Sequence, residues 1–189
     1  APDFDDGETD RGTVFVYHGG PTGLSTGGED WRATGDRESA RLGTAVSTAG
    51  DVNGDGYADV LIGAPDFNDG QSSEGAAFVY YGGPTGLITT TLWSAHPTDQ
   101  GNAYFGAAVS TAGDVNGDGY GDGPTGTDGG SGEESGAGAA VVYHGGPTGP
   151  ITTTLWITHP TDQGDAHFGT AVSTAGDVNG DGYADILIG

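Results

Sequence analysis

Apolar residues occur along this chain in short runs bounded by glycine, proline or aspartate. Four kinds of run predict four kinds of strand: a small, weakly alternating one at 105–111, an apolar one at 58–63, an aromatic one at 76–81 and a threonine-rich one at 88–93. The apolar run is typical of a strand covered on both faces, and the threonine-rich run of an exposed outer strand. No segment carries the apolar stripe of a helix.

The runs repeat with a period of 63 residues. The sequence Asp-Val-Asn-Gly-Asp-Gly-Tyr occupies 51–57, 114–120 and 177–183, and Gly-Gly-Pro-Thr-Gly turns recur at the same offset. The chain is therefore a single repeat array with units 1–63, 64–126 and 127–189. Four strands per unit predict an all-β fold of β-propeller blades, each made of four antiparallel strands. A solenoid or a sandwich is a less natural alternative.

Composition excludes several classes of function. The 189 residues include 27 Asp plus Glu and only four Lys plus Arg, for a formal net charge of −23. A basic surface for nucleic acid is therefore excluded. No apolar run approaches the ~20 residues of a membrane helix, so we expect no membrane span. Without cysteine the chain has no disulfide, thiolate metal site or thiol nucleophile. The 40 glycines recur in register, as tight turns and close contacts between blades require.

The aspartate loop carries the most informative chemistry. In 51–59, oxygen-bearing side chains stand at positions 1, 3, 5 and 9, position 7 offers a backbone carbonyl, and a glycine at position 6 allows a sharp turn. This spacing is typical of a loop around a hard divalent cation, and a flexible set of carboxylates and carbonyls favours Ca²⁺ over Mg²⁺. An EF-hand would need Glu at position 12, where Ile62 stands. An ordinary turn is the alternative, which three complete copies make less favourable.

The combined motifs resemble a known family. Phe105-Gly106, the Asp-x-Asn-x-Asp-Gly-x-x-Asp loop and the following 61–65 (Leu-Ile-Gly-Ala-Pro) are similar to the FG-GAP repeat of integrin α-subunit propellers, with relatives in bacterial surface and secreted proteins. The resemblance implies one Ca²⁺ in each loop between the first two strands of a blade, three per chain. The ligands that it implies are Asp51, Asn53, Asp55, Tyr57 (carbonyl) and Asp59 in the first loop, Asp114, Asn116, Asp118, Tyr120 and Asp122 in the second, and Asp177, Asn179, Asp181, Tyr183 and Asp185 in the third.

Two departures from the family pattern stand out. The first unit has Leu42-Gly43 in place of Phe-Gly, and its Trp31 lies one position out of register with the other two tryptophans. The second loop runs into an aberrant segment, 123–136, that begins Gly-Pro-Thr-Gly-Thr where an apolar strand is expected. We expect that this stretch cannot form the buried strand. A disordered insertion, an engineered segment and an unreliable stretch of sequence are all compatible with it.

The repeat register splits a blade between the chain ends. The N-terminal part supplies the outer half of a blade, and the C-terminal part supplies an inner half. Propellers typically close with four to eight blades, so three do not form a ring. The alternatives are two chains joined head to tail as a six-bladed dimer, a piece of a longer protein, and an open assembly. We expect a homo-oligomer or an open assembly as the working form.

These features favour a calcium-binding scaffold at the cell surface or outside the cell, non-enzymatic, that serves adhesion or the recognition of a protein or glycan. A self-assembling filament or surface-layer subunit is the first alternative. A lectin that stacks sugars on tryptophan is the second, although repeated tryptophans on strands are more typical of packing between blades. The tryptophans are Trp31, Trp93 and Trp156.

Sequence features speak against an enzyme. The histidines lie beside turns or in outer segments, and we interpret them as solvated side chains. They are His18, His96, His144, His159 and His167. The loops and the acidic surface account for most carboxylates.

Overall fold

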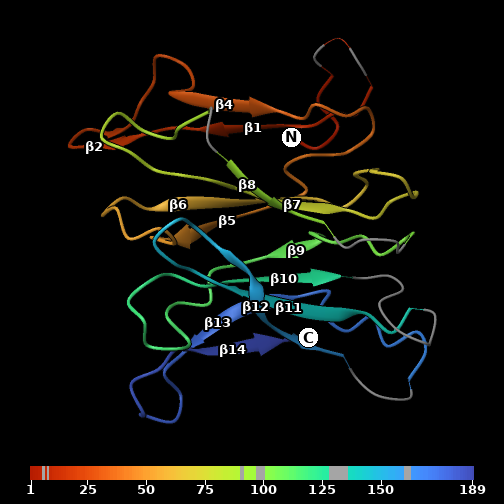
Figure 1. Ribbon diagram of the computed structural model, residues 1–189. Helices are drawn as coiled ribbons and strands as arrows, with labels where there is room; N and C mark the ends of the chain where they lie inside the picture. Colours follow the sequence, from red (N-terminus) through yellow and green to blue (C-terminus); the bar gives the residue numbers. More distant parts are fainter. Residues whose placement is uncertain (6, 8, 90–91, 97–100, 128–135, 160–162) are drawn as a thin grey trace.

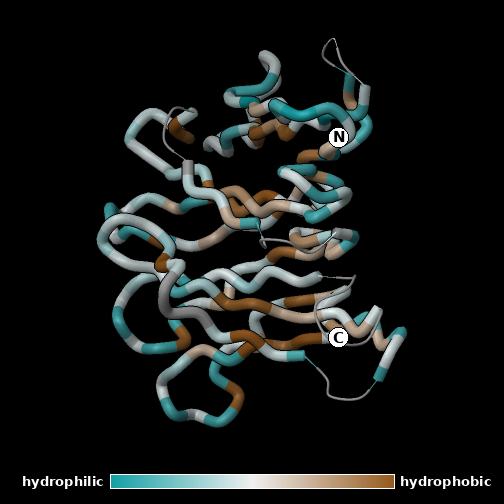
Figure 2. The backbone as a smooth tube through the Cα atoms, turned by 45° about the vertical axis from the view of Figure 1, so that its right-hand side comes forward, coloured by the Kyte–Doolittle hydropathy of each residue, from teal (hydrophilic) through white to brown (hydrophobic). Residues whose placement is uncertain are grey.

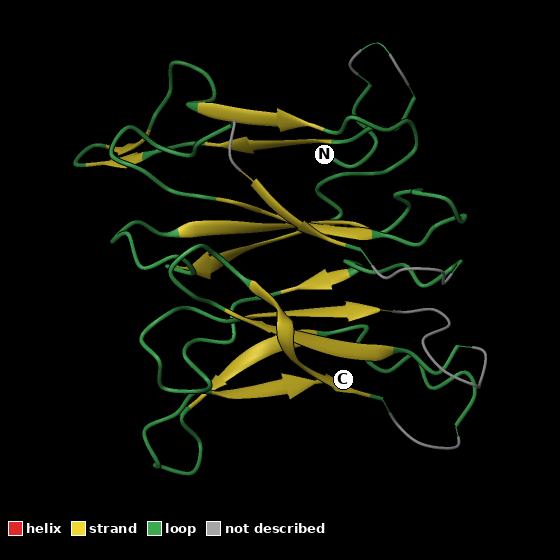
Figure 3. Ribbon diagram, viewed as in Figure 1, coloured by secondary structure: helices red, strands yellow, loops and turns green. Residues whose placement is uncertain are grey.

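The computed structural model describes residues 1–189 apart from 6, 8, 90–91, 97–100, 128–135 and 160–162. In these described residues every regular element is a β-strand and no helix occurs (Figure 1, Figure 3). The all-β prediction is therefore confirmed. The strands are β1 (Thr13–Val16), β2 (Gly19–Gly20), β3 (Gly23–Leu24), β4 (Trp31–Thr34), β5 (Ala45–Gly50), β6 (Asp59–Ala64), β7 (Ala76–Tyr80), β8 (Leu92–Ala95), β9 (Ala108–Val109), β10 (Gly123–Thr127), β11 (Ala139–His144), β12 (Ile151–Thr158), β13 (Val172–Gly176) and β14 (Asp185–Ile188).

Twelve of the strands form two complete blades and two half-blades, and β2 and β3 form a separate two-stranded sheet. One blade has the strand order β5-β6-β7-β8 and the other the order β9-β10-β11-β12, and all neighbours are antiparallel. The pair β1-β4 is the outer half of a blade, and the pair β13-β14 is an inner half. The sheets follow one another from the N-terminal to the C-terminal end (Figure 1). The fourth strand of each complete blade lies at its edge, as predicted.

Two strands are shorter than predicted. The first strand of the second complete blade pairs only over Ala108–Val109, because its partner contains Pro124. Ser110 N donates to Pro124 O at 3.2 Å, but proline has no N–H with which to return the bond. The fourth strand of the first complete blade begins at Leu92 rather than at Ile88. Ile88 N donates instead to Tyr81 O at 2.9 Å, in the turn that follows β7.

The prediction that the segment after the second loop cannot form a buried strand is wrong for 123–127, while 128–135 of that segment lie outside the described residues. β10 (Gly123–Thr127) lies in the middle of its blade, between β9 and β11, and Pro124 is fully buried. Main-chain pairing with β11 continues over all five residues, because it does not depend on apolar side chains. Gly126, like its counterpart Gly63, allows the main chain of the next blade to approach closely, because a Cβ at either position would overlap a carbonyl oxygen of that blade.

Aromatic pairs join consecutive blades. Trp31 meets Tyr80 edge to face at 5.0 Å between ring centroids, and Trp93 meets Tyr143 in the same way at 4.9 Å. The one-residue offset of Trp31 therefore leaves the pair intact. Two clusters of buried apolar side chains surround these pairs, and the hydrophobic stretches of the chain follow the strands (Figure 2). The prediction of tryptophan packing between blades is confirmed for Trp31 and Trp93.

Candidate metal centre

The three acidic loops occupy equivalent places in the fold. Each joins the first strand of a blade to the second: β5 to β6, β9 to β10, and β13 to β14. All three lie along one side of the array, at the left in Figure 1. Gly54 and Gly56 take φ values of +74° and +89°, which favour glycine, and their counterparts in the other loops do the same. The glycine positions of the motif are therefore required by the turn.

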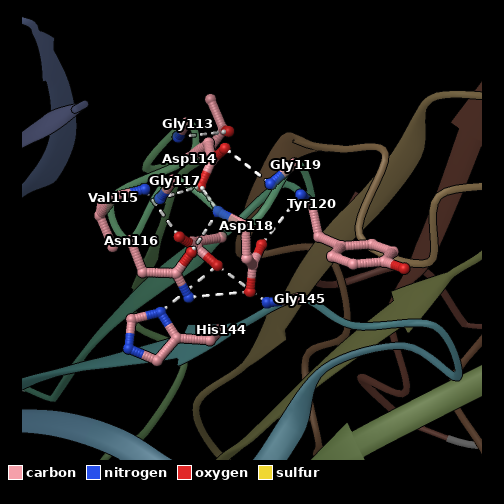
Figure 4. A network of polar contacts seen from close by, with 12 residues as sticks. Gly113, Asp114, Val115, Asn116, Gly117, Asp118, Gly119, Tyr120, His144 and Gly145 are labelled. Carbon is pink, nitrogen blue, oxygen red and sulfur yellow. Dashed lines mark hydrogen bonds and ion pairs between the residues drawn. The ribbon is translucent and has the colours of Figure 1, made fainter. Parts of the chain in front are cut away.

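The first aspartate of each loop organises the turn. Asp51 Oδ1 accepts hydrogen bonds from Gly54 N at 2.7 Å and Asp55 N at 3.0 Å, and its Oδ2 accepts one from Gly56 N at 2.8 Å. Asp114 and Asp177 make the same three bonds in their own loops. Figure 4 shows this network around Asp114.

Positions 3 and 5 lie beside the first aspartate. Asn53 Nδ2 donates to Asp55 Oδ2 at 3.0 Å, and Asn53 Oδ1 accepts from Asp55 N at 3.0 Å. Asp55 Oδ1 accepts from Tyr57 N at 2.9 Å. The second and third loops repeat these bonds. The structure thus brings positions 1, 3 and 5 together in all three loops.

The aspartate at position 9 has a different setting. Asp59 is fully buried, and its carboxylate accepts bonds from Val52 N at 2.8 Å and from Gly82 N at 2.7 Å. Burial raises its pKa, the two hydrogen bonds oppose this, and the charges of Asp55 and Asp51 raise the pKa further. Position 9 therefore braces the loop against the main chain, and its carboxylate is close enough to positions 1 and 5 for their charges to act on it. Across the described residues no group of three or more His, Cys, Asp or Glu side chains is arranged to hold a metal ion.

The donor chemistry of the loops nevertheless fits a hard cation. The side chains at positions 1, 3, 5 and 9 are all carboxylates or an amide. Oδ1 of the first aspartate accepts two hydrogen bonds, but its Oδ2 and both carboxylate oxygens of Asp55 accept one each and keep a lone pair for a cation. The arginines with described ion-pair partners, Arg32, Arg37 and Arg41, contact carboxylates outside the loops. The clustered negative charge is thus left for a cation to neutralise.

The interpretation of the histidines as solvated is wrong for His144. Only 17% of its side chain is exposed, and its Nδ1 lies 3.4 Å from Asp122 Oδ1. Gly145 N donates to the same oxygen at 2.8 Å, which draws His144 over the buried carboxylate (Figure 4). His18, the counterpart in the first unit, is 46% exposed.

Sequence reasoning missed the glycine that begins each Gly-Gly-Pro-Thr-Gly turn. Gly82 and Gly145 donate to the position-9 aspartates, Asp59 and Asp122, from 23 residues further along the chain. The signal was available, because turn and loop recur with the same 63-residue offset.

With divalent cations removed, we expect the melting temperature to rise when the pH is lowered from about 7 toward about 4. Burial raises the pKa of Asp59 and Asp122 above 3.8, so the folded chain holds these protons more tightly than the unfolded chain. Stability is then lost as the pH rises through the window above 3.8. Hydrogen bonds lower the pKa of Asp30 and Asp177, but both are exposed and screened. Differential scanning calorimetry in chelator at the two pH values measures the trend, and a lower melting temperature at the acidic pH would contradict it.

Antiparallel four-stranded blades with an acidic loop between their first two strands define a β-propeller protein of the repeat type. The FG-GAP repeat family matches residues 42–80 and 168–189, which include the first and third loops. The chain thus carries FG-GAP repeats and is similar to integrin α-subunits.

Three relatives show the extent of this similarity. Integrin alpha-PS2 of Drosophila melanogaster is 34% identical over 169 residues, integrin alpha-7 of Rattus norvegicus 30% over 159, and integrin alpha-IIb of Mus musculus 31% over 168. The alignments cover 82%, 82% and 84% of this chain but only 12%, 13% and 16% of the relatives, so the chain spans a small part of their length. Among the described residues, no helix has the length and apolarity needed to cross a membrane.

Proposed function

We propose that each acidic loop binds one Ca²⁺, three per chain. The ligands are the side chains at positions 1, 3, 5 and 9 and the position-7 carbonyl: Asp51, Asn53, Asp55, Asp59 and Tyr57 in the first loop, Asp114, Asn116, Asp118, Asp122 and Tyr120 in the second, and Asp177, Asn179, Asp181, Asp185 and Tyr183 in the third. The supporting observation is the same preorganised oxygen network, repeated bond for bond in all three loops. The ion supplies positive charge that holds the carboxylates together.

Calorimetric titration of the chelator-treated protein with CaCl₂ tests these sites. We expect about three ions per chain, with weaker binding of Mg²⁺, which demands a stricter octahedral geometry. Binding of no calcium at millimolar concentration would remove the proposal.

The proposed role is a non-enzymatic scaffold for adhesion or recognition, at the cell surface or outside the cell. Relatives named as integrin α-subunits support this role. A cavity of about 360 Å³ between the first half-blade and the first complete blade offers a recognition site. Phe67, Phe78 and Tyr80 line it, with Asp36 and His96 as polar groups. Binding assays against extracellular-matrix proteins and a glycan array, with and without calcium, test the role; no calcium-dependent ligand in either assay would oppose it.

Self-assembly is the second candidate, with a second copy of the chain as the head-to-tail partner. Among the described residues β14 pairs only with β13, and the outer edge of β1 is bonded only at Thr13, to Ala1. The β6–β7 register carried over by the repeat sets Leu187 opposite Val16 of the next copy. Leu187 is 64% exposed, whereas its counterpart Leu61 is 2% exposed. Tyr17 and Trp156 are likewise 48% and 44% exposed, where the repeated pairs would bring them together. A further repeat in the same polypeptide would pair with these edges in the same way as a second copy.

Two copies joined at both ends would hold six blades, within the usual range of four to eight. Sedimentation of the 189-residue chain with calcium should give a particle of two or more copies, and a monomer at micromolar concentration would exclude a second copy as the partner. Electron microscopy distinguishes closed rings from extended fibres. The packing of Trp31 and Trp93 between blades weighs against the lectin alternative and leaves Trp156 as the exposed tryptophan.

A further inference from the structure

Consecutive acidic loops are linked by a main-chain bridge. Gly121 N, in the second loop, donates to the carbonyl of Asp51 in the first loop at 2.8 Å. Ala184 N, in the third loop, donates in the same way to the carbonyl of Asp114 in the second at 3.0 Å. Each bridge thus runs from position 8 of one loop to position 1 of the loop before it.

The donor of each bridge belongs to the same peptide group as the position-7 carbonyl. Gly121 N–H is bonded to the carbonyl carbon of Tyr120, which is the main-chain ligand of the proposed calcium site. A cation at that oxygen polarises the peptide group and strengthens its N–H as a donor, because hydrogen bonds in series reinforce one another. The acceptor, Asp51, carries the carboxylate that organises the preceding loop.

A side-chain contact accompanies the bridge. The ring of Tyr120 points away from its own loop (Figure 4) and lies over Gly54, at position 4 of the first loop, so that a Cβ there would be 2.5 Å from Tyr120 Cε1. Tyr183 lies over Gly117 in the same way, with 2.6 Å for the corresponding distance. Only glycine at position 4 leaves space for the ring of the next loop.

The first and second loops share one more connection. Gly145 N holds the carboxylate of Asp122, in the second loop, at 2.8 Å, and the adjacent Gly146 N donates to Val52 O, in the first loop, at 2.9 Å. A single dipeptide therefore contacts both loops. Ordering of either loop restricts the conformations open to the other.

We propose that these bridges make calcium binding to consecutive loops positively cooperative. This inference rests on the calcium sites proposed above. An ion in the second loop fixes the Tyr120–Gly121 peptide and the Tyr120 ring against the first loop, so the first loop is already ordered when its own ion binds. Coupling between two sites is reciprocal and typically changes affinity about 5- to 150-fold. We expect about fivefold between the first and second loops.

Matched glycine substitutions test the coupling. Gly54→Ala would displace the Tyr120 ring, whereas a Cβ at Gly180, the same position of the third loop, would meet no atom within 4 Å. The φ values of the two glycines are +74° and +76°, so both substitutions carry the same backbone strain. Tyr120→Ala removes the ring without that strain and retains the carbonyl. Circular dichroism checks that each variant folds.

Calcium binding to the full chain is measured with a calcium-selective electrode. The expected wild-type isotherm has a Hill coefficient above 1, which Gly54→Ala and Tyr120→Ala lower and Gly180→Ala preserves. Binding of about three ions with a Hill coefficient of 1, or equal effects of Gly54→Ala and Gly180→Ala, would overturn the coupling while leaving the calcium sites in place. Absence of calcium binding in the wild type would overturn the sites and the coupling together.

Discussion

Removal of divalent cations is expected to lower the melting temperature by at least about 15 °C. A ligand that binds only the folded state stabilises it by about 2.7 kcal/mol at a free concentration of 100 times its Kd. Three such sites contribute about 8 kcal/mol, and for a chain of this size each kcal/mol corresponds to roughly 2–4 °C. Thermal unfolding with excess CaCl₂ and with excess EDTA measures the difference.

The net charge of −23 requires a control, because any salt reduces the repulsion among the carboxylates. Both scans should therefore be run in NaCl of about 0.15 M, where added millimolar calcium changes screening very little. A variant that combines Asp51→Ala, Asp114→Ala and Asp177→Ala lacks the first ligand of every loop, and we expect calcium to leave its melting temperature unchanged. Equal melting temperatures of the wild type in CaCl₂ and EDTA would rule out the sites as sources of stability.

The repeat period predicts most of the architecture. A sequence that recurs every 63 residues must fold into the same unit each time, so the four-stranded blade, the place of the acidic loop and the split between the chain ends all follow from it. The tryptophan pairs follow as well, because side chains repeated on a strand meet the same neighbour in each blade. Even Trp31, which lies one position out of register, packs against Tyr80.

The local composition of a segment predicts less of the structure than the repeat period does. Gly123–Thr127 contains none of the apolar residues of its counterparts, yet it is a buried central strand, because β11 and the next blade confine it. The sequence pattern also does not predict the surroundings of the Asp59 carboxylate or the contact of His144 with Asp122. Both depend on main-chain donors in a turn that lies 23 residues beyond each aspartate. Such contacts become predictable only when the spatial relation of loop and turn is known.

Substitution of Gly63 or Gly126 by alanine is expected to destabilise the protein by about 3 kcal/mol, roughly 6–12 °C in melting temperature. A Cβ at Gly63 would overlap the carbonyl oxygen of Gly106, and one at Gly126 that of Gly169. These contacts are between main chains of consecutive blades, so no side chain can turn aside to make room. The blades would have to separate, which disrupts the buried clusters between them.

Gly19→Ala and Gly27→Ala are the matched controls for this prediction. A Cβ at either position would meet no atom within 4 Å, and neither glycine has a positive φ. Alanine should then be neutral or stabilise by up to about 1 kcal/mol, because it reduces the conformational freedom of the unfolded chain. In thermal or urea unfolding, alanine is therefore expected to lower the stability at Gly63 and Gly126 and to leave it unchanged or raise it at Gly19 and Gly27. If Gly63→Ala proved as stable as Gly19→Ala, the close packing of main chains between blades could not be what holds the array together.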